Sequence, residues 1–213
     1  MKEIVILGAG DFGKEVAWLL EEINKQTPTY TILGYLDDDP GKIGQRFNGY
    51  ECLGPVSHLT ELCQTHQVCA VIANQDAGIR RKFVEMFPGF EDWETLIHPS
   101  VHMADTSTVG KGCVICAGGN ISCNTTVGDF CIFNIAVTLG HDCVVGDYVS
   151  IMSGSCISGH VTIGDSAYLA TNCTVVPGMK IGNNAKVGAG SVVIRNVKPG
   201  VTVMGVPAKV LQF

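Results

Sequence analysis

One histidine of this chain has a neighbour suited to acid–base chemistry. His141 stands in the segment FNIAVTLGHDCVVGDYV, and Asp142 follows it directly. A histidine suits general-base catalysis because its ordinary pKa of about 6.5 leaves the imidazole mostly neutral at physiological pH. A neighbouring carboxylate would fix the tautomer and stabilise the imidazolium. The alternative, a solvated surface histidine without a catalytic role, stays open at this point.

The elements that must position His141 form a six-residue repeat between Ile97 and Lys198. The first position of every hexad in this stretch is apolar, an unbroken run that indicates a true period. Six residues advance a helix by about 600°, so in a helix these side chains would be spread around the cylinder instead of forming one face. The residues at the first hexad position are Ile97, Met103, Val109, Ile115, Ile121, Val127, Phe133, Leu139, Val145, Ile151, Ile157, Ile163, Leu169, Val175, Ile181, Val187 and Val193.

Two further positions of the hexad are restricted. The fifth position is small or slim, as in Ser107, Cys113, Thr125, Cys131, Cys143, Ser155, Ala167, Cys173, Ala185 and Ser191. Glycine often takes the second, as in Gly110, Gly128, Gly140, Gly146, Gly164, Gly182 and Gly188. Short strands joined by tight corners fit this pattern, because the large and the small side chain then both point inward and glycine relieves crowding at the bend.

The segments VGDFCI, VGDYVS, IGDSAY and VVPGMKIGNNAKVGAGSVV resemble those of the hexapeptide-repeat acyltransferases. The resemblance implies an all-β left-handed parallel β-helix with three hexads per coil, in which each coil rises by about 4.8 Å. The left hand runs against the usual crossover rule and rests on the resemblance alone. We expect this domain over residues 96–213, closed by a cap from Pro199 to Phe213.

Three hexads per coil bring a second group to His141. Eighteen residues make one turn, so Gly159 should stack one strand spacing above His141 on the same edge. A backbone N–H of Gly159 could donate to a thioester carbonyl and then to the developing oxyanion. No Ser or Cys adjoins a base in a nucleophile arrangement, which favours direct transfer.

Residues 1–95 predict a small α/β domain with a parallel sheet. A strand from Glu3 to Leu7 leads into GAGDFG, whose glycines have G-x-G-x-x-G spacing, and a helical segment follows. A second strand, Thr31 to Leu36, ends in an acidic triplet that begins at Asp37. This is the first unit of a nucleotide-binding fold, in which glycine lets the backbone approach a phosphate.

The rest of this domain completes a β-α-β-α-β order. We expect a loop from Lys42 to Pro55, a helix from Val56 to His66 and a buried strand from Val68 to Ala73. A last amphipathic helix, Ile79 to Phe87, is expected to carry its basic residues, Arg80, Arg81 and Lys82, on the exposed side.

The glycine turn has two other interpretations. A nicotinamide dehydrogenase also has this fingerprint, but about ninety-five residues allow only part of a six-stranded dinucleotide sheet, and the following coil has no role in hydride chemistry. A purely structural turn is the second alternative. We favour a nucleotide-sugar site.

Composition narrows the function classes. The first 95 residues hold eight Lys/Arg and fifteen Asp/Glu, and the remainder holds six and five, so no basic patch favours nucleic acid. The sequence shows no bilayer-spanning apolar run and no signal peptide, so we expect a cytoplasmic protein without a membrane partner.

The ten cysteines are interpreted as reduced, with several filling the core of the coil. We assign no metal, because His98 and His102 need not converge within hexads. His160 follows Gly159, and a surface role for it is favoured over a role in the groove.

GHDCVVG, the Gly159 position, LDDD and the glycine-turn start together resemble the bacterial nucleotide-sugar acetyltransferases of the sialic-acid and bacillosamine type, which acetylate 4-amino sugars. The resemblance implies that His141 is the base and that Asp142 raises its basicity. It implies an acetyl-CoA groove lined by Ser150, Gly159, Thr171 and Ala189. It further implies nucleotide contacts from Gly10, Asp11, Phe12, Asp37 and Asp38, and an acceptor contact from Asn134.

Two departures concern the substrate. Family members often carry histidine where this chain has Phe12, and a second histidine where it has Ser150. We expect an acetyl-CoA-dependent N-acetyltransferase of a nucleotide-linked amino sugar, and the resemblance implies a homotrimer with active sites between subunits. The alternatives are O-acetylation of a sugar or sialic acid hydroxyl, and a non-catalytic β-helix module that binds a nucleotide sugar.

Overall fold

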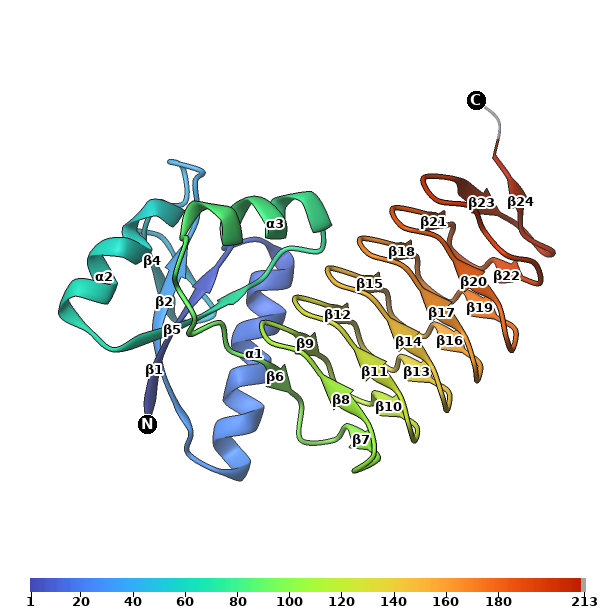
Figure 1. Ribbon diagram of the computed structural model, residues 1–213. Coiled ribbons are helices and arrows are strands. Elements are labelled where there is room, and N and C mark those ends of the chain that lie inside the picture. The colour runs from blue at the N-terminus through green and yellow to red at the C-terminus, as the bar shows by residue number, and fades with distance from the viewer. Residues whose placement is uncertain (212–213) are drawn as a thin grey trace. The chain divides into compact units, whose positions relative to one another are not determined.

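The computed structural model describes residues 1–211 and divides into two compact units, which meet in the sequence between Pro99 and Ser100 (Figure 1). The first unit is an α/β fold and the second is a coil of short parallel strands. Both parts of the predicted fold class are therefore confirmed. Gln212 and Phe213, the end of the expected cap, lie outside the described residues.

The first unit is built on a five-stranded sheet of order β3-β4-β2-β1-β5. β1 runs parallel to both β2 and β5, and residues 4–7 of β1 are completely buried, so this strand forms the centre of the core. The strands are β1 (Lys2–Leu7), β2 (Tyr30–Leu36), β3 (Arg46–Phe47), β4 (Tyr50–Gly54) and β5 (Val68–Ile72), and β6 (Leu96–Ile97) follows near the end of the unit.

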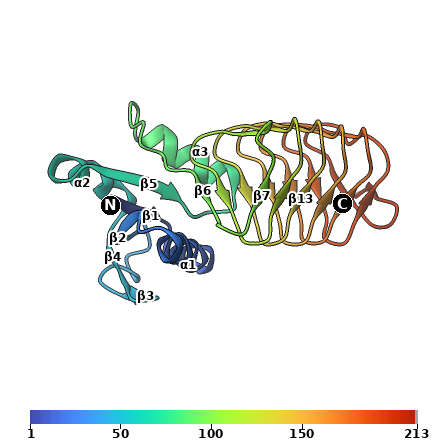
Figure 2. The same cartoon turned by 90° about the horizontal axis from the view of Figure 1, so that it is seen from below.

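Helices cover the two faces of this sheet. α1 (Asp11–Gln26) and α2 (Leu59–Thr65) lie on opposite sides of it (Figure 2). In α1 the buried side chains include Phe12, Val16, Leu19 and Leu20, whose spacing places them on one helical face. A 3₁₀ turn (Val56–His58) precedes α2, and α3 (Ala77–Met86) follows β5.

The segment from Lys42 to Pro55 is not the loop that we expected. It contains a hairpin in which β3 pairs antiparallel with β4, and β4 in turn pairs parallel with β2. The hairpin turns at Asn48 and Gly49, which both have positive φ, 48° and 86°. An Asn-Gly pair with this backbone is the strongest short-range hairpin signal, and the sequence interpretation overlooked it.

Arg80 also differs from expectation, because it is fully buried instead of exposed. Its Nη1 donates a hydrogen bond to the carbonyl oxygen of Asn74 at 2.8 Å. This hydrogen bond links the first turn of α3 to the loop that follows β5. The guanidinium is buried because it donates to the carbonyl oxygen of Asn74. Arg81 and Lys82 are exposed as predicted.

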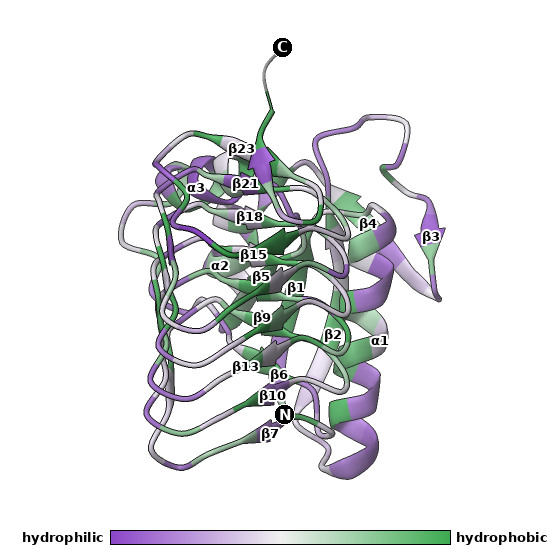
Figure 3. Ribbon diagram, turned by 90° about the vertical axis from the view of Figure 1, so that its right-hand side faces the viewer, coloured by the Kyte–Doolittle hydropathy of each residue, from purple (hydrophilic) through white to green (hydrophobic). Residues whose placement is uncertain are grey.

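The second unit is a coil with three parallel sheets. A strand pairs with the strand eighteen residues later, as Thr138 does with Cys156, so three hexads make one turn. Side chains at the first hexad position, such as Leu139 and Ile157, fill the interior. In Figure 3 the hydrophobic colouring follows the stacked strands and the hydrophilic colouring gathers on the turns between them.

We call the three sheets faces I, II and III. Face I holds β7 (His102–Met103), β10 (Asn120–Ile121), β13 (Thr138–Leu139), β16 (Cys156–Ile157), β19 (Thr174–Val175) and β22 (Val192–Val193). Face II holds β8 (Thr108–Val109), β11 (Thr126–Val127), β14 (Val144–Val145), β17 (Thr162–Ile163) and β20 (Lys180–Ile181). Face III includes β9 (Val114–Ile115), β12 (Ile132–Phe133), β15 (Ser150–Ile151), β18 (Tyr168–Leu169) and β21 (Lys186–Val187).

The end of the coil is covered by a short hairpin. β23 (Thr202–Met204) pairs parallel with β21, and β24 (Lys209–Val210) pairs antiparallel with β23. This arrangement continues face III past the last repeat, and it occupies a strand edge that would otherwise be open.

The turns of the coil use a left-handed backbone at the fourth hexad position. Asn124, Asp142 and His160 occupy this position in three successive rungs, with φ between 56° and 59°. Residues other than glycine are uncommon in this conformation, although Asn, Asp and His are enriched in it. The fifth position points inward, as predicted, and the thiols of Cys143 and Cys173 there are buried, which raises the pKa of each.

Candidate active site

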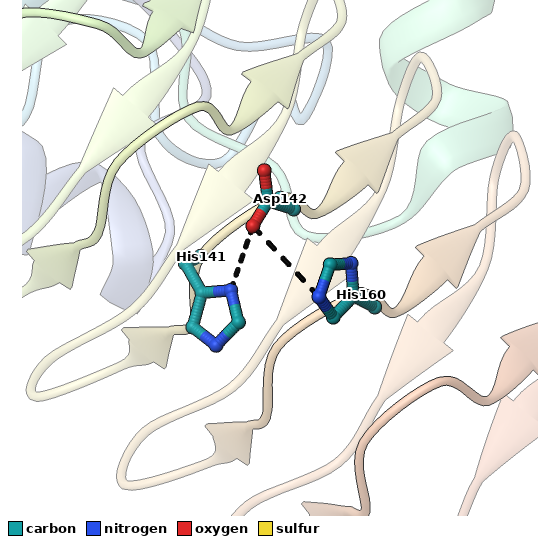
Figure 4. A group of neighbouring side chains, drawn as sticks. All are labelled: His141, Asp142 and His160. Atoms are coloured by element: carbon teal, nitrogen blue, oxygen red, sulfur yellow. Dashed lines mark hydrogen bonds and ion pairs between the residues drawn. The ribbon is translucent and has the colours of Figure 1, made fainter.

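The site is built on one corner of the coil, where the chain passes from face I to face II. We call it the His141 corner, and it comprises residues 122–125, 140–143 and 158–161, which stack as three successive turns. Figure 4 shows three of its side chains, those of His141, Asp142 and His160. His141 and His160 are exposed and Asp142 is partly exposed, so the predicted base points away from the coil interior.

Asp142 orients the imidazole of His141. The Nδ1 atom of His141 lies 2.7 Å from Oδ2 of Asp142. Hydrogen bonds from His141 and from Nδ2 of Asn124, at 3.2 Å, lower the pKa of the Asp142 carboxyl, which is therefore an ionised acceptor at neutral pH. A carboxylate only accepts hydrogen bonds, so Nδ1 carries the proton and Nε2 keeps its lone pair. Nε2 is the atom that can accept a proton from a substrate.

Gly159 lies directly against this imidazole, one rung further along the coil. A Cβ atom placed on Gly159 would be 2.5 Å from Nε2 of His141 and 2.7 Å from Cε1. Any side chain at position 159 would therefore overlap with the ring. The structure brings together the two groups that coil periodicity predicted to be neighbours.

The N–H group of Gly159 is open to a ligand. Among the described residues no hydrogen-bond acceptor takes it. At another corner the equivalent N–H groups of Asp129 and Asp147 are taken by the carboxylate of the next rung, at 2.8 and 3.0 Å. A Cβ atom on Gly140 would lie 2.5 Å from the Gly159 nitrogen, so glycine at position 140 leaves this donor uncovered. The His141 corner thus presents a proton acceptor beside a hydrogen-bond donor.

His160 completes the cluster. Its backbone N–H donates to the carbonyl oxygen of His141 at 2.9 Å, and its ring meets that of His141 edge to face, with centroids 4.9 Å apart. Nε2 of His160 is 3.9 Å from Oδ2 of Asp142, so the carboxylate faces two imidazoles (Figure 4).

Four other predicted residues lie elsewhere on the coil. Asn134, Thr171 and Ala189 occupy turns that lead from face III to face I, which we call the Asn134 corner, and Ser150 belongs to β15 of face III. Asn134 is buried, and its Oδ1 accepts hydrogen bonds from the Ile135 N–H and the Ser153 hydroxyl, at 2.7 and 3.0 Å. Within one chain, these residues are not brought to the His141 corner.

The predicted nucleotide-binding residues lie at the carboxyl ends of β1 and β2. Asp37 accepts the N–H of Ala9 at 2.8 Å and the ammonium of Lys42 at 2.9 Å through Oδ2, and the N–H of Asp39 at 2.9 Å through Oδ1. Burial would raise the pKa of Asp37, but the bonds from Lys42 and from the Asp39 and Ala9 N–H groups outweigh it, so the pKa is lowered. Asp37 therefore shapes the glycine turn.

The glycine turn itself is tightly packed on one side and open on the other. A Cβ on Gly13 would overlap the carbonyl of Gly8, and a Cβ on Gly8, whose φ is 114°, would lie 2.9 Å from the Ala73 oxygen. Gly10 caps the start of α1, and apart from its chain neighbours no described residue comes within 4 Å of its Cβ position. A phosphate can approach the backbone at the amino terminus of α1 there.

The neighbours of Gly10 have different environments. Asp11 is fully exposed and pairs with Lys14 at 3.0 Å, whereas the side chain of Phe12 is buried within the first unit. Asp38 accepts the N–H of Val56 at 2.9 Å. Of these predicted contacts, Gly10 and Asp11 lie at the open side of the turn.

The loops after β1 and β2 lie at the carboxyl edge of the sheet, and the sequence interpretation missed a third loop there. β5 ends at Ile72, and the polar segment 74–76 follows at the same carboxyl edge as the glycine turn. Asn74 accepts the Asp76 N–H at 2.9 Å, and Asp76 caps α3 by accepting the Ile79 N–H at 3.0 Å. Polar residues directly after a buried parallel strand were the signal that could have identified this loop.

The fold and the His141 corner together define an acyltransferase of the hexapeptide-repeat type. The family model for the PglD N-terminal domain matches residues 3–87, and the model for six bacterial transferase hexapeptide repeats matches residues 160–195. Among the described residues, no helix is long and apolar enough to cross a membrane.

Solved structures extend the match over the whole chain. The acetyltransferase domain of PglB from Neisseria gonorrhoeae is 30% identical, with a TM-score of 0.91 over 99% of this chain and 100% of that one. A perosamine N-acetyltransferase from Caulobacter crescentus, solved as a histidine-to-asparagine mutant with CoA and GDP-perosamine, is 28% identical, with a TM-score of 0.90 over 100% of this chain and 98% of that one. WeeI from Acinetobacter baumannii is 30% identical, with a TM-score of 0.88 over 99% and 100% of the two chains.

A curated relative, the UDP-N-acetylbacillosamine N-acetyltransferase of Bacillus subtilis, is 33% identical over 124 residues, or 55% of this chain. The match spans about half of that relative, 52% of its length. The chain belongs to the hexapeptide-repeat acetyltransferases of bacterial nucleotide sugars, whose fold is a small α/β domain followed in the sequence by a left-handed parallel β-helix.

Proposed function

We propose that this protein transfers the acetyl group of acetyl-CoA to the amino group of a nucleotide-linked amino sugar of the 4-amino type. The observation that carries the proposal is the pairing of the free Nε2 of His141 with the open N–H of Gly159. Relatives of this fold were solved with CoA and GDP-perosamine, which are a donor product and a nucleotide-linked sugar.

The reaction proceeds in one transfer. The sugar amine attacks the thioester carbonyl, a C–N bond forms, and Nε2 of His141 accepts the proton that the amine loses. Asp142 stabilises the imidazolium through Nδ1–H. The N–H of Gly159 donates to the developing oxyanion, which is worth about 10²- to 10³-fold in rate for one such donor. The intermediate collapses, the C–S bond breaks, and CoA leaves as a thiolate that takes up a proton.

The first unit would recognise the nucleotide. Its open backbone at Gly10 and the amino terminus of α1 suit a diphosphate, because helix amino termini favour anions. Asp37 and Asp38 contribute by holding the surrounding turns through their bonds to the N–H groups of Ala9 and Val56. Phe12 would act through packing, since its side chain is buried.

We further propose that the complete site forms between copies in a homotrimer. The predicted acceptor and acetyl-CoA residues at the Asn134 corner would meet the His141 corner of a neighbouring copy. Two exposed apolar side chains support this pairing. Ile135 stands at the Asn134 corner and is 39% exposed, and Val144 follows the His141 corner and is 53% exposed. Contact between the two corners would remove both from water.

A reducing compartment suits the chain, and we propose the cytoplasm. No disulfide is present among the described residues, which include all ten cysteines, buried and exposed. Proteins in oxidising compartments commonly pair such residues, whereas cytosolic thiols stay reduced.

The test is a panel of nucleotide-linked amino and hydroxy sugars incubated with acetyl-CoA, with free thiol release as the readout. An amino sugar should be acetylated, and His141→Ala should lose about 10²-fold or more in kcat, as removal of a general base does. His102→Ala is the matched control, because His102 is an exposed histidine of face I.

Three results would contradict the proposal. Exclusive acetylation of hydroxy sugars would make the enzyme an O-acetyltransferase. Nucleotide-sugar binding without thiol release in any combination would make it a binding module. Equal activity of His141→Ala and His102→Ala would remove the base from the mechanism.

A further inference from the structure

Three side chains at the His141 corner can bind a metal ion. Their donor atoms, from His141, Asp142 and His160, all lie within 4.8 Å of one another. Figure 4 shows a nitrogen of each ring facing the Asp142 carboxylate. We propose that this cluster binds one Zn²⁺ or another late first-row divalent ion, and that the bound ion inhibits the enzyme. The inhibitory part rests on the function proposed above, and the binding part does not.

The donor set selects the kind of ion. Two imidazole nitrogens and one carboxylate oxygen favour Zn²⁺, Cu²⁺, Ni²⁺ or Co²⁺ over Mg²⁺ and Ca²⁺, which prefer oxygen ligands. The cluster is exposed, so water would complete the coordination shell. Three protein ligands with an open position are also a common Zn²⁺ arrangement.

Only small rotations are needed to form the site. The Asp142 Oδ2 atom is 2.7 Å from Nδ1 of His141 and 3.9 Å from Nε2 of His160. Ligands of one tetrahedral Zn²⁺, at bond lengths near 2.0–2.1 Å, are roughly 3.3 Å apart. The two rings already stand at 89° to each other. The backbone is held between rungs, because the Asp142 N–H donates to Cys123 and the His160 N–H donates to His141.

The metal would inactivate the base through its tautomer. In the active form Nδ1 of His141 carries the proton and Nε2 holds the lone pair. An ion bound at Nδ1 needs the lone pair there, so the proton of the neutral ring moves to Nε2. The proton is conserved, but the ring can no longer accept one from the amine. Inhibition should therefore lower kcat and leave the KM for acetyl-CoA unchanged.

The test uses the full-length protein and two probes, Co²⁺ for spectroscopy and Zn²⁺ for inhibition. Wild type should bind one Co²⁺ per chain at this cluster with visible d–d bands. Zn²⁺ should inhibit acetyl transfer until EDTA is added. His160→Gln should weaken both effects by more than about tenfold, as loss of a metal-supporting group does. Cys123→Ser, which removes an exposed thiol one rung before His141, should leave both unchanged.

Inhibition is measured against the metal-free rate of each variant, so any change of basal activity in His160→Gln cancels. Failure of wild type to bind stoichiometric Co²⁺, equal effects in wild type and His160→Gln, or an intense thiolate band that disappears in Cys123→Ser would each overturn the metal site. A protein that binds Co²⁺ as expected but acetylates no sugar would overturn the proposed function and leave the metal site standing.

Discussion

At the scale of single residues, the environment separates His141 from the other histidines of the coil. His102 is exposed on face I and pairs with no carboxylate of the described residues, whereas His141 has Asp142 at 2.7 Å and a glycine under its ring. The acid fixes which nitrogen holds the proton, and the glycine provides space beside the other nitrogen. Residue type alone does not distinguish the two histidines. The adjacent Asp142 and the Gly159 of the next rung do.

Asp37 gives a prediction at this scale. Its side chain is 14% exposed and accepts two backbone N–H groups and the ammonium of Lys42. Asp37→Ala leaves those donors without their acceptor, and we expect the first unit to lose about 1–3 kcal/mol of stability. Both tryptophans, Trp18 and Trp93, lie in this unit, so urea unfolding followed by tryptophan fluorescence measures it.

The loss should depend on pH with a defined sign. The folded-state pKa of Asp37 is lowered, so its contribution is complete above the unfolded value of about 3.9 and disappears as the pH falls through the lower folded value. The difference between wild type and Asp37→Ala should shrink in that acid range. Asp11→Ala, at a fully exposed acid, should leave the stability close to that of wild type at every pH. A difference that stays constant on acidification would contradict this account.

At the scale of elements, the turns of the coil decide which backbone groups remain available. Where the chain passes from face II to face III, the carboxylates of Asp147 and Asp165 take the outward N–H groups of the preceding rung. At the His141 corner no carboxylate of residues 1–211 accepts the N–H of Gly159, and the absence of a side chain on Gly140 leaves this donor uncovered. The two corners have the same backbone geometry. The side chain of the next rung decides whether the outward N–H is taken or remains available to a ligand.

Gly140 gives a prediction at this scale. A Cβ at position 140 would lie 2.5 Å from the Gly159 nitrogen, so Gly140→Ala should strain the turn and also cover the donor. Gly128→Ala is the matched control, because its Cβ would crowd Asp147 and the Gly146 backbone at another corner. Each substitution should cost about 1–3 kcal/mol of stability.

Only Gly140→Ala should cover the N–H of Gly159. We therefore expect the kcat of Gly140→Ala to be about 10²-fold lower than that of Gly128→Ala. Thermal unfolding and steady-state kinetics on both variants measure the two effects separately. If the two variants lose stability and turnover in parallel, the N–H of Gly159 has no special part in the reaction.

At the scale of the whole molecule, charge and exposed apolar groups favour assembly of the coil. The first 95 residues carry the acidic excess, and the coil has almost equal numbers of acidic and basic residues. A nearly neutral surface can be buried against copies of itself at low electrostatic cost. The predicted ligand residues are divided between two corners of one chain, and a shared site in an oligomer would unite them.

Mixed oligomers test the shared site. His141→Ala and Asn134→Ala should each be impaired, but chains unfolded together and refolded as a mixture should regain about a quarter of the wild-type sites, because half of the copies supply each intact corner. A mixture of His141→Ala and Gly159→Ala should regain nothing, since both residues belong to the same corner of one chain. Recovery in the second mixture, or none in the first, would place the complete site within one chain.

Much of the fold was readable from the sequence because it depends on local periodicity. The hexads from Ile97 onward specify which side chains must be buried, and burial at a six-residue period excludes a helix and fits a coil of short strands. The eighteen-residue return, which the family resemblance implies, then places Gly159 beside His141, as the structure shows. The glycine spacing after Leu7 likewise predicted a turn in which a side chain at Gly13 would have no room.

Other features were settled only by contacts between distant segments. The sequence itself determined the repeat, the α/β start and the candidate base, because these follow from spacing and residue type. Tertiary structure decided that Arg80 is buried against Asn74, that Asp37 holds the turn at Ala9, and that the Gly159 N–H stays open. Each of these depends on which partner another part of the chain brings within hydrogen-bond distance, and no local pattern contains that information.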